Sequence, residues 1–305
     1  MEKQIDSVNL HFNNDSLLAL NICLAIIMYG VALDLKISDF KRIASIPKSA
    51  LLGIFSQFIA LPAITFILVY LIEPIPSIAL GMILVAACPG GNISNFMTHL
   101  AKGNAALSVT LTAFSTLLAF IMTPINLSFW ASFYPPTKLL LTEISLNPFE
   151  LLKTIALILG IPLILGMLTN AHFPHIAEKM QKILKPLSML IFILFVVIAF
   201  ANNFDIFLDY FQYVVWLVLI HNAIALFTGY SVASIFSLSS EDRKTLTIET
   251  GIQNSGLGLI IIFSFFDGLG GMAIIAAWWG IWHIISGLII GYVWSRTKIM
   301  AGAAT

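Results

Sequence analysis

Long apolar stretches without any ionisable residue recur along this chain, and they limit what it can fold into. Two examples are Leu187–Ala201 and Val214–Ile220. Asp, Glu, Lys and Arg together make up only 10% of the 305 residues, against about 25% in an average soluble domain. A soluble protein with so few charges could not cover its surface, and the recurring apolar runs exclude one large soluble α/β core. We therefore expect a polytopic membrane protein.

Nine stretches are long and apolar enough to cross a bilayer, which takes about 20 residues each. The segment Met1–Asp15 lacks the basic part of a secretory signal, so we expect the first stretch to remain as a transmembrane helix. The predicted fold class is an all-α membrane protein with nine transmembrane helices. In chain order the predicted spans are Ser16–Leu35, Pro47–Ile72, Ser77–Leu100, Asn104–Trp130, Pro148–Asn170, Leu184–Phe204, Phe211–Phe236, Thr245–Phe266 and Gly271–Ser295.

The basic residues support this count and give an orientation. With alternating spans, 12 of the 15 Lys and Arg residues fall on one side, and only Lys3, Lys138 and Lys153 fall on the other. Loops rich in Lys and Arg are cytoplasmic, so we expect a multi-pass protein of the cell membrane with its N-terminus outside and its C-terminus in the cytoplasm. The twelve residues are Lys36, Lys41, Arg42, Lys48, Lys102, Lys179, Lys182, Lys185, Arg243, Lys244, Arg296 and Lys298.

Glu249 is the only acidic residue within an otherwise apolar predicted span, and it begins the polar run Glu249–Gly256. Ionisable groups inside a bilayer are costly and mark functional sites. Gln253 follows four residues later, on the same helical face. The competing interpretation places Glu249 at the cytoplasmic mouth, five residues after Lys244. That interpretation does not account for the neighbouring amides.

The third predicted span has a matching interruption at Cys88–Asn95, where a proline is followed by two glycines. These residues favour an unwound stretch, which a membrane tolerates only where the freed backbone groups meet protein or line a cavity. A simple kink is the alternative, although three polar residues follow the break. The third and eighth spans cross in opposite directions, and paired interruptions of this kind are typical of an inverted-repeat transporter with its site at the midplane.

Three further polar residues lie inside predicted spans. Ser108 and Thr112 are four residues apart on one helical face, and Gln57 is the only amide in Ile54–Ile64. Alone, such hydroxyls often bond to their own helix, and such an amide can join two helices. Together with one carboxylate they suit a hard cation such as Na⁺, while the N-terminal ends of broken helices suit an anion. Two Na⁺ ions beside an ionised Glu249 would leave about one positive charge, which favours a monoanionic substrate.

Five stretches carry a resemblance to a known family. Cys88–Asn95, with Gly103–Ser108 after it, and Glu249–Gly256 resemble the two long signatures of the bile acid:sodium symporter (BASS) family, and Gly30–Lys36 and His221–Asn222 resemble shorter ones. The resemblance covers nearly the whole chain. It implies inverted repeats, with two broken helices that cross near the membrane centre.

The resemblance also implies domains and site residues. Residues 47–130 and 211–295 would form a core domain, and residues 16–35 and 148–204 a panel domain. One sodium site would use Ser94, Asn95, Ser108, Thr112 and Glu249, and the other Gln57, Glu249, Thr250, Ile252 and Gln253, with Thr250 and Ile252 acting through backbone carbonyls. Substrate would lie between core and panel at Asn92, Ile93, Asn254, Ser255 and His283. Asn92 stands where many bacterial relatives have Thr, and Ile284 follows His283 where they often have Asn.

The resulting prediction is a sodium-coupled symporter that carries small organic anions, such as bile salts or pantoate-like carboxylates, by alternating access with two Na⁺ ions. The alternative is a proton-coupled exchanger that uses Glu249, with His221 as a possible relay, although the pair His221–Asn222 also fits helix packing. An intramembrane enzyme with paired aspartates is not expected, because Asp occurs only near the ends of the predicted spans. The net charge of zero gives no sign of a nucleic-acid partner.

Overall fold

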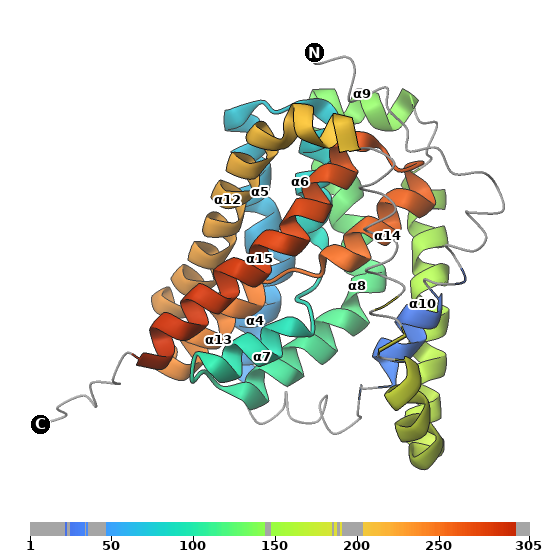
Figure 1. The fold of residues 1–305 in the computed structure, drawn as a ribbon, viewed down its shortest axis with the longest axis vertical. Helices are drawn as coiled ribbons and strands as arrows, with labels where there is room; N and C mark the ends of the chain where they lie inside the picture. Colours follow the sequence, from blue (N-terminus) through green and yellow to red (C-terminus); the bar gives the residue numbers. More distant parts are fainter. Residues whose placement is uncertain are drawn as a thin grey trace, which may run out of the picture.

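A computed structural model of the chain describes residues 22, 25–33, 35, 47–143, 148–184, 186, 187, 190 and 204–296. These residues are almost entirely helical, and the helices pack side by side in one bundle (Figure 1). The named elements are α4 (Pro47–Phe55), η1 (Ser56–Ala60), α5 (Leu61–Ile72), α6 (Pro76–Ala87), α7 (Ile93–Leu100), α8 (Ala105–Phe133), α9 (Pro135–Glu143), α10 (Pro148–His172), α12 (Phe204–Ile235), α13 (Ser240–Gly251), α14 (Ser255–Phe265) and α15 (Gly270–Arg296).

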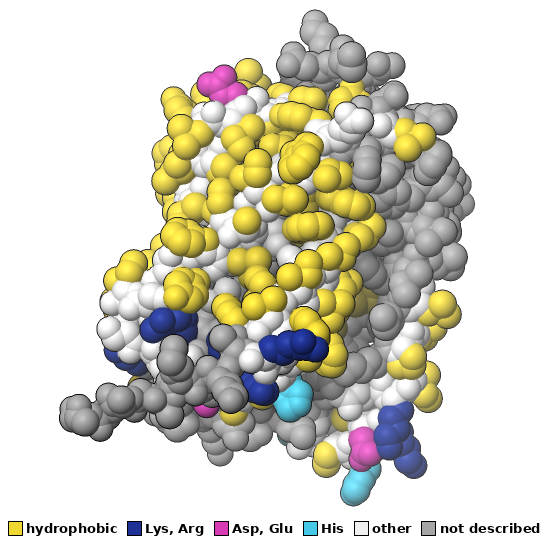
Figure 2. Space-filling model, turned by 60° about the vertical axis from the view of Figure 1, so that its left-hand side comes forward, with side chains coloured by type: hydrophobic (Ala, Val, Ile, Leu, Met, Phe, Trp, Pro, Cys, Tyr) yellow, Lys and Arg dark blue, Asp and Glu magenta, His cyan; other side chains and the backbone are white. Residues whose placement is uncertain are grey.

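Within the described residues, four helices are long and apolar enough to cross a membrane: Pro47–Ile72, Ala105–Phe133, Gln212–Ile235 and Gly270–Arg296. They confirm the second, fourth, seventh and ninth predicted spans as helices. Figure 2 shows one face of the molecule largely covered by hydrophobic side chains, with Lys and Arg gathered toward one end. Nine of the twenty residues of the predicted span 16–35, and most of the span 184–204, lie outside the described residues, so the count of nine stays a prediction.

Some helix ends differ from the predicted ones. α13 begins at Ser240 rather than at Thr245, because the Ser239 side chain accepts a hydrogen bond from the backbone N–H of Asp242 and caps a polar first turn. α12 begins at Phe204, seven residues before the predicted start of the seventh span. The helix α9 was not predicted, since it is too short to span a bilayer.

Both interrupted spans are broken helices, as predicted, rather than kinked ones. The chain leaves helical geometry between α6 and α7 and again between α13 and α14. The breaks meet in space: the backbone N–H of Gly91 donates to the carbonyl of Ile252 (2.9 Å), and that of Asn254 donates to Pro89 (2.8 Å). Between these bonds Gly90 forms an antiparallel bridge with Gln253. Each break thus supplies hydrogen-bond partners that the other needs inside a membrane.

The second span is also irregular, at the position of Gln57. The backbone N–H of Leu61 donates to Ser56, five residues back, which defines the π-helical turn η1. Pro62 follows and has no N–H to continue the α-helical ladder. A single π turn rotates the following residues and is frequent at functional sites. Here it lies next to α13, and Gln57 is fully buried.

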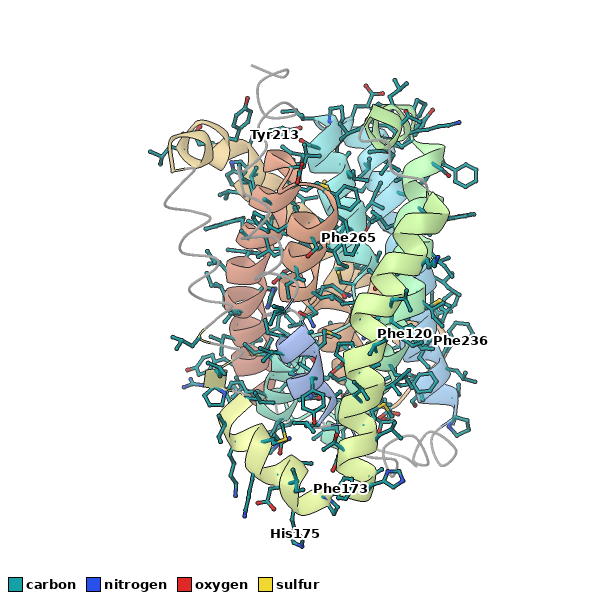
Figure 3. All side chains as sticks on the ribbon, turned by 90° about the vertical axis from the view of Figure 1, so that its right-hand side faces the viewer. Phe120, Phe173, His175, Tyr213, Phe236 and Phe265 are labelled. Carbon is teal, nitrogen blue, oxygen red and sulfur yellow. The ribbon has the colours of Figure 1, made fainter. Side chains whose placement is uncertain are left out.

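The broken helices sit in the middle of the bundle. Every residue of α6 from Ser77 to Ala87 is buried. The contact with α15 is close, because a Cβ added at Gly81 would lie only 2.8 Å from the Cα of Met272. The long helix α10 runs along the side of the molecule that faces the viewer in Figure 3, and Phe173 and His175 lie just beyond its lower end.

Candidate sodium and substrate site

Glu249 lies in the last turn of α13 and is fully buried. Its carboxylate accepts hydrogen bonds from the hydroxyls of Ser94 on α7 (2.6 Å), Ser108 on α8, and Thr112 on α8 (3.1 Å to Oε2). Asn95 joins the group, since its Oδ1 accepts from Ser108 (2.8 Å) and from Thr112 (3.2 Å). These contacts exclude the interpretation that Glu249 is a solvated residue at the mouth. The structure also brings together all five residues that the resemblance implies for one sodium site.

The three acceptor oxygens of this cluster, Asn95 Oδ1 and the two Glu249 oxygens, have more lone pairs than the hydroxyls of Ser94, Ser108 and Thr112 have protons. Ser108 has a single proton, yet its oxygen lies within hydrogen-bond distance of both Asn95 Oδ1 and a Glu249 oxygen. Thr112 is in the same position, with Asn95 Oδ1 and both Glu249 oxygens within 3.3 Å. A carboxylate, an amide oxygen and three hydroxyl oxygens in mutual contact form the kind of ligand set that a hard cation prefers.

A second group of buried amides covers the C-terminal end of α13. A helix leaves its last carbonyls without intrahelical partners. Here Gln57 Nε2 donates to the carbonyl of Glu249 (3.2 Å), and Gln253 Nε2 donates to that of Thr250 (2.7 Å). Asn222 Nδ2 donates to the next carbonyl in the chain, that of Gly251 (2.8 Å). Three amide side chains thus satisfy three consecutive carbonyls.

The oxygen atoms of the same three amide side chains are not used in these hydrogen bonds. Gln57 Oε1, Gln253 Oε1 and Asn222 Oδ1 are buried, and none has a hydrogen-bond partner among the described residues. A buried acceptor without a partner costs about 1–3 kcal/mol. Unpaired acceptors next to the negative end of a helix suit a cation. Gln57, Glu249, Thr250 and Gln253 are therefore brought together as the resemblance implies. The Ile252 carbonyl accepts from Gly91 and has one lone pair left.

Sequence reasoning did not assign Asn222 to this group. It treated Asn222 with His221 as either a proton relay or a helix-packing pair. The structure joins His221 Nε2 to Thr65 Oγ1 (2.8 Å), with the ring edge-on to Trp279 at 4.7 Å, so His221 connects α12 with α5 and α15. Asn222 instead faces α13. Its amide inside an apolar span was the available signal.

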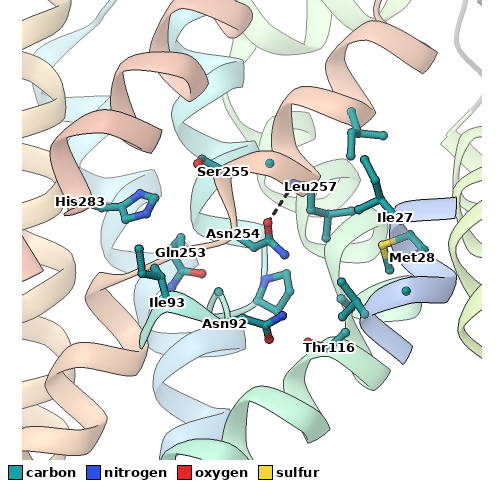
Figure 4. Close-up of a pocket in the computed structure, with 17 residues that line it drawn as sticks. Ile27, Met28, Asn92, Ile93, Thr116, Gln253, Asn254, Ser255, Leu257 and His283 are labelled. Carbon is teal, nitrogen blue, oxygen red and sulfur yellow. Dashed lines mark hydrogen bonds between the residues drawn. The ribbon is translucent and has the colours of Figure 1, made fainter. Parts of the chain in front are cut away.

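A cavity of about 330 Å³ lies beside the two breaks (Figure 4). Its walls come from residues 27–31, from α8 and α15, and from the two breaks with the helix starts that follow them. No Lys, Arg, Asp or Glu is among its described lining residues. The predicted substrate residues that line it are Asn92, Ile93, Asn254, Ser255 and His283.

Two helix N-termini border this cavity. The Asn254 side chain accepts a hydrogen bond from the backbone N–H of Leu257 (3.0 Å) and so caps α14. Asn92 precedes α7 and makes no such side-chain cap. N-terminal ends carry free N–H groups and a partial positive charge. The cavity therefore presents polar groups and a weak positive potential to a ligand, without a Lys or Arg side chain among its described lining residues.

The structure combines a helical bundle with apolar spans, two broken helices that meet, and buried oxygen clusters beside a cavity. This combination defines a membrane transporter. The chain belongs to the Sodium Bile acid symporter family, whose sequence profile matches residues 21–210. As a member of this family it is a sodium-dependent transporter and not an enzyme.

Individual relatives agree with this assignment. The chain is 32% identical to the uncharacterized sodium-dependent transporter YocS of Bacillus subtilis, over 91% of this chain and 83% of the relative. It is 30% identical to the probable sodium/metabolite cotransporter BASS1, chloroplastic, of Arabidopsis thaliana, over 90% of this chain and 66% of that protein. It is 29% identical to the sodium/bile acid cotransporter 4 of Mus musculus, over 78% of this chain. The aligned region spans just over half of the mouse protein, 54% of its length.

Proposed function

We propose that this protein is a sodium-coupled symporter of small organic anions that works by alternating access. It binds two Na⁺ ions near the two helix breaks, between α6 and α7 and between α13 and α14. The observation that carries the proposal is the cluster of buried oxygens around Glu249, whose lone pairs outnumber the hydroxyl protons that face them. The hydroxyls of Ser108 and Thr112 each face two acceptors with one proton. One cation beside this carboxylate and one beside the three amide oxygens would satisfy both groups.

The cavity favours a compact anion over a large one. A volume of about 330 Å³ lies at the low end of the range of about 300–1,000 Å³ for ligand pockets. Two Na⁺ ions and one ionised carboxylate carry a net charge of about +1, which complements a monoanion. We therefore propose pantoate-like carboxylates rather than bile salts as the substrate class, with the carboxylate held by the helix starts at Asn92 and Asn254.

Alternating access requires two bodies that move against each other. We propose that residues 47–130 and 211–295 form the core, and that residues 16–35 and 148–204 form the panel. Two contacts support the panel as a unit: Tyr29 donates from its hydroxyl to Thr169 (3.0 Å), and Asn170 Nδ2 donates to the carbonyl of Leu35 (2.9 Å). The cavity lies between the two sets, since Ile27 and Met28 face the breaks across it (Figure 4).

The orientation follows from the distribution of basic residues. We propose that the first turn of α13, with Arg243 and Lys244, lies at the cytoplasmic end of the protein in the cell membrane. The N-terminus would then be outside and the C-terminus in the cytoplasm. The proposed ion sites, at the C-terminal end of α13, would then lie between the cytoplasmic end of the protein and the cavity.

Transport into proteoliposomes tests the function. An inward Na⁺ gradient at fixed pH should drive uptake of a compact monocarboxylate such as pantoate, and a proton gradient of either direction without Na⁺ should not. Asn92→Ala and Asn254→Ser should weaken substrate binding and leave Na⁺ binding unchanged, because serine keeps the cap of α14. Uptake driven by protons alone would favour the proton-coupled exchanger instead. Preference for a bile salt over every small carboxylate would overturn the proposed substrate class.

A further inference from the structure

A second polar cluster lies on the helices of the sodium site, toward the predicted cytoplasmic end. Asp242 in the first turn of α13 accepts a hydrogen bond from the Ser49 hydroxyl of α4 (2.6 Å, to Oδ2). Its other oxygen accepts from Asn104 Nδ2 (2.8 Å), and Asn104 is the N-cap residue of α8. Each carboxylate oxygen therefore binds a donor from a different element. We call Ser49, Asn104 and Asp242 the clasp.

The clasp uses the same helices that supply the candidate sodium ligands. Each clasp residue precedes a sodium-site residue on its own helix, by eight, four and seven residues respectively. At 3.6 residues per turn, spacings of four and seven place Asn104 and Asp242 on about the same helical face as their counterparts, and a spacing of eight places Ser49 about 80° from Gln57. The clasp thus fixes the relative position of α4, α8 and α13 one to two turns from the ion site. The three pairs are Ser49 with Gln57, Asn104 with Ser108, and Asp242 with Glu249.

Further bonds hold α13 to the end of α7 and to the start of α8 without Asp242. Lys244 Nζ donates to the carbonyl of Ala101 at the end of α7 (2.9 Å). The backbone N–H of Asn104 donates to the Thr245 hydroxyl (2.8 Å). Loss of the Asp242 carboxylate would therefore loosen the helix ends without separating them. The expected effect is on ligand geometry at the ion site more than on folding.

We propose that Asp242 is a positioning residue for sodium binding, which acts through the clasp to hold Ser108 and Gln57 in register with Glu249. This inference rests on the proposed sodium site at Glu249. Hydrogen bonds to an ionised carboxylate are about twice as strong as neutral ones, so the clasp constrains the helix ends more than a neutral trio would. When the ligand side chains are held in place before the ion binds, less of the binding free energy is lost in ordering them.

The position next to Asp242 offers a matched control. Glu241 also lies in the first turn of α13, but its side chain is exposed. Asp242→Asn and Glu241→Gln make the same change of charge in the same helical turn, where acidic residues interact favourably with the helix dipole. Only Asp242→Asn weakens the clasp. A difference between the two variants therefore isolates the clasp from helix electrostatics.

A double variant that exchanges the side chains at Asn104 and Asp242 distinguishes an effect on the geometry of the sodium ligands from a general loss of stability. Asn104→Asp combined with Asp242→Asn exchanges the two groups and keeps one carboxylate facing one amide. Aspartate is as good an N-cap as asparagine, so the bond from the backbone N–H of Leu107 is kept. Ser49→Ala removes one donor and leaves the carboxylate, and so provides a milder change if Asp242→Asn does not fold.

The experiment is a Na⁺ titration of the purified full-length protein, with melting temperature as readout and ionic strength held by K⁺. We expect Asp242→Asn to raise the half-saturating Na⁺ concentration by about tenfold, Ser49→Ala by less, Glu241→Gln hardly at all, and the swap to restore most of the affinity. A lower melting temperature without Na⁺ but an unchanged titration overturns the inference, and so does an equal shift in Asp242→Asn and Glu241→Gln. Glu249→Gln separates the two claims: if that variant still responds to Na⁺ like the wild type, the proposed sodium site fails, whatever Asp242 does.

Discussion

The substitution Gly90→Ala places one methyl group inside the candidate ion site. An ideal Cβ at this position would lie 2.9 Å from Glu249 Oε2, 3.0 Å from Gln57 Nε2 and 3.1 Å from the Glu249 carbonyl. Ordinary contacts begin near 3.4 Å, so these groups must retreat by about 0.3–0.5 Å. Metal–oxygen distances tolerate only about 0.2 Å. Overpacking of this kind costs about 1–3 kcal/mol, and if the cost falls on the ion-bound state, Na⁺ binding becomes about 5–150-fold weaker.

Gly91→Ala is the matched control for this prediction. An ideal Cβ there has no neighbour nearer than 3.6 Å. Among the described glycines only Gly268 has a positive φ, so alanine is compatible with the backbone at both positions. Both variants also change the unfolded chain in the same way. We would titrate each purified protein with Na⁺ in the absence of substrate and follow the melting temperature. A Gly90→Ala protein that titrates like the wild type, or two variants that shift alike, would refute the reasoning.

Three further substitutions and one control have defined outcomes. Thr112→Val keeps the shape of the side chain but removes the hydroxyl near Glu249, and should weaken Na⁺ binding in the same titration; unchanged binding would place Thr112 outside the site. Asn222→Leu leaves the Gly251 carbonyl without its donor and should lower the free energy of unfolding by about 1–3 kcal/mol, seen as a lower melting temperature even without Na⁺. Gly229→Ala forces α12 against the backbone of α13 and should also destabilise by about 1–3 kcal/mol, whereas Gly258→Ala, with only one neighbour at 3.7 Å, should not.

Features that depend on local chain chemistry could be predicted from the sequence. Apolar runs long enough to span a bilayer gave four helices that the structure describes as continuous spans. The proline and glycines at Cys88–Asn95, and the polar run after Glu249, gave the two breaks, because these residues cannot continue an apolar helix at low cost. Ser108 and Thr112 were placed on one face by their spacing alone, and that face meets Glu249 in the structure.

Features that depend on contacts between distant parts of the chain could not be predicted. Asn222 reaches a carbonyl 29 residues away, and Asp242 accepts from Ser49, 193 residues away. No spacing rule relates such residues. The π turn at Gln57 is a local feature, but Pro62 permits it without requiring it, so its signal was missed. The start of α13 was set too late because the prediction followed hydrophobicity, while the helix starts at a polar cap.

Direct binding of radioactive Na⁺ to the purified protein tests the central claim that the Glu249 carboxylate holds a cation. The wild type should show saturable binding that excess unlabelled Na⁺ displaces and K⁺ does not. Glu249→Gln keeps the size of the side chain but removes its charge, and saturable binding should disappear. Equal Na⁺ binding by the two proteins would contradict the account.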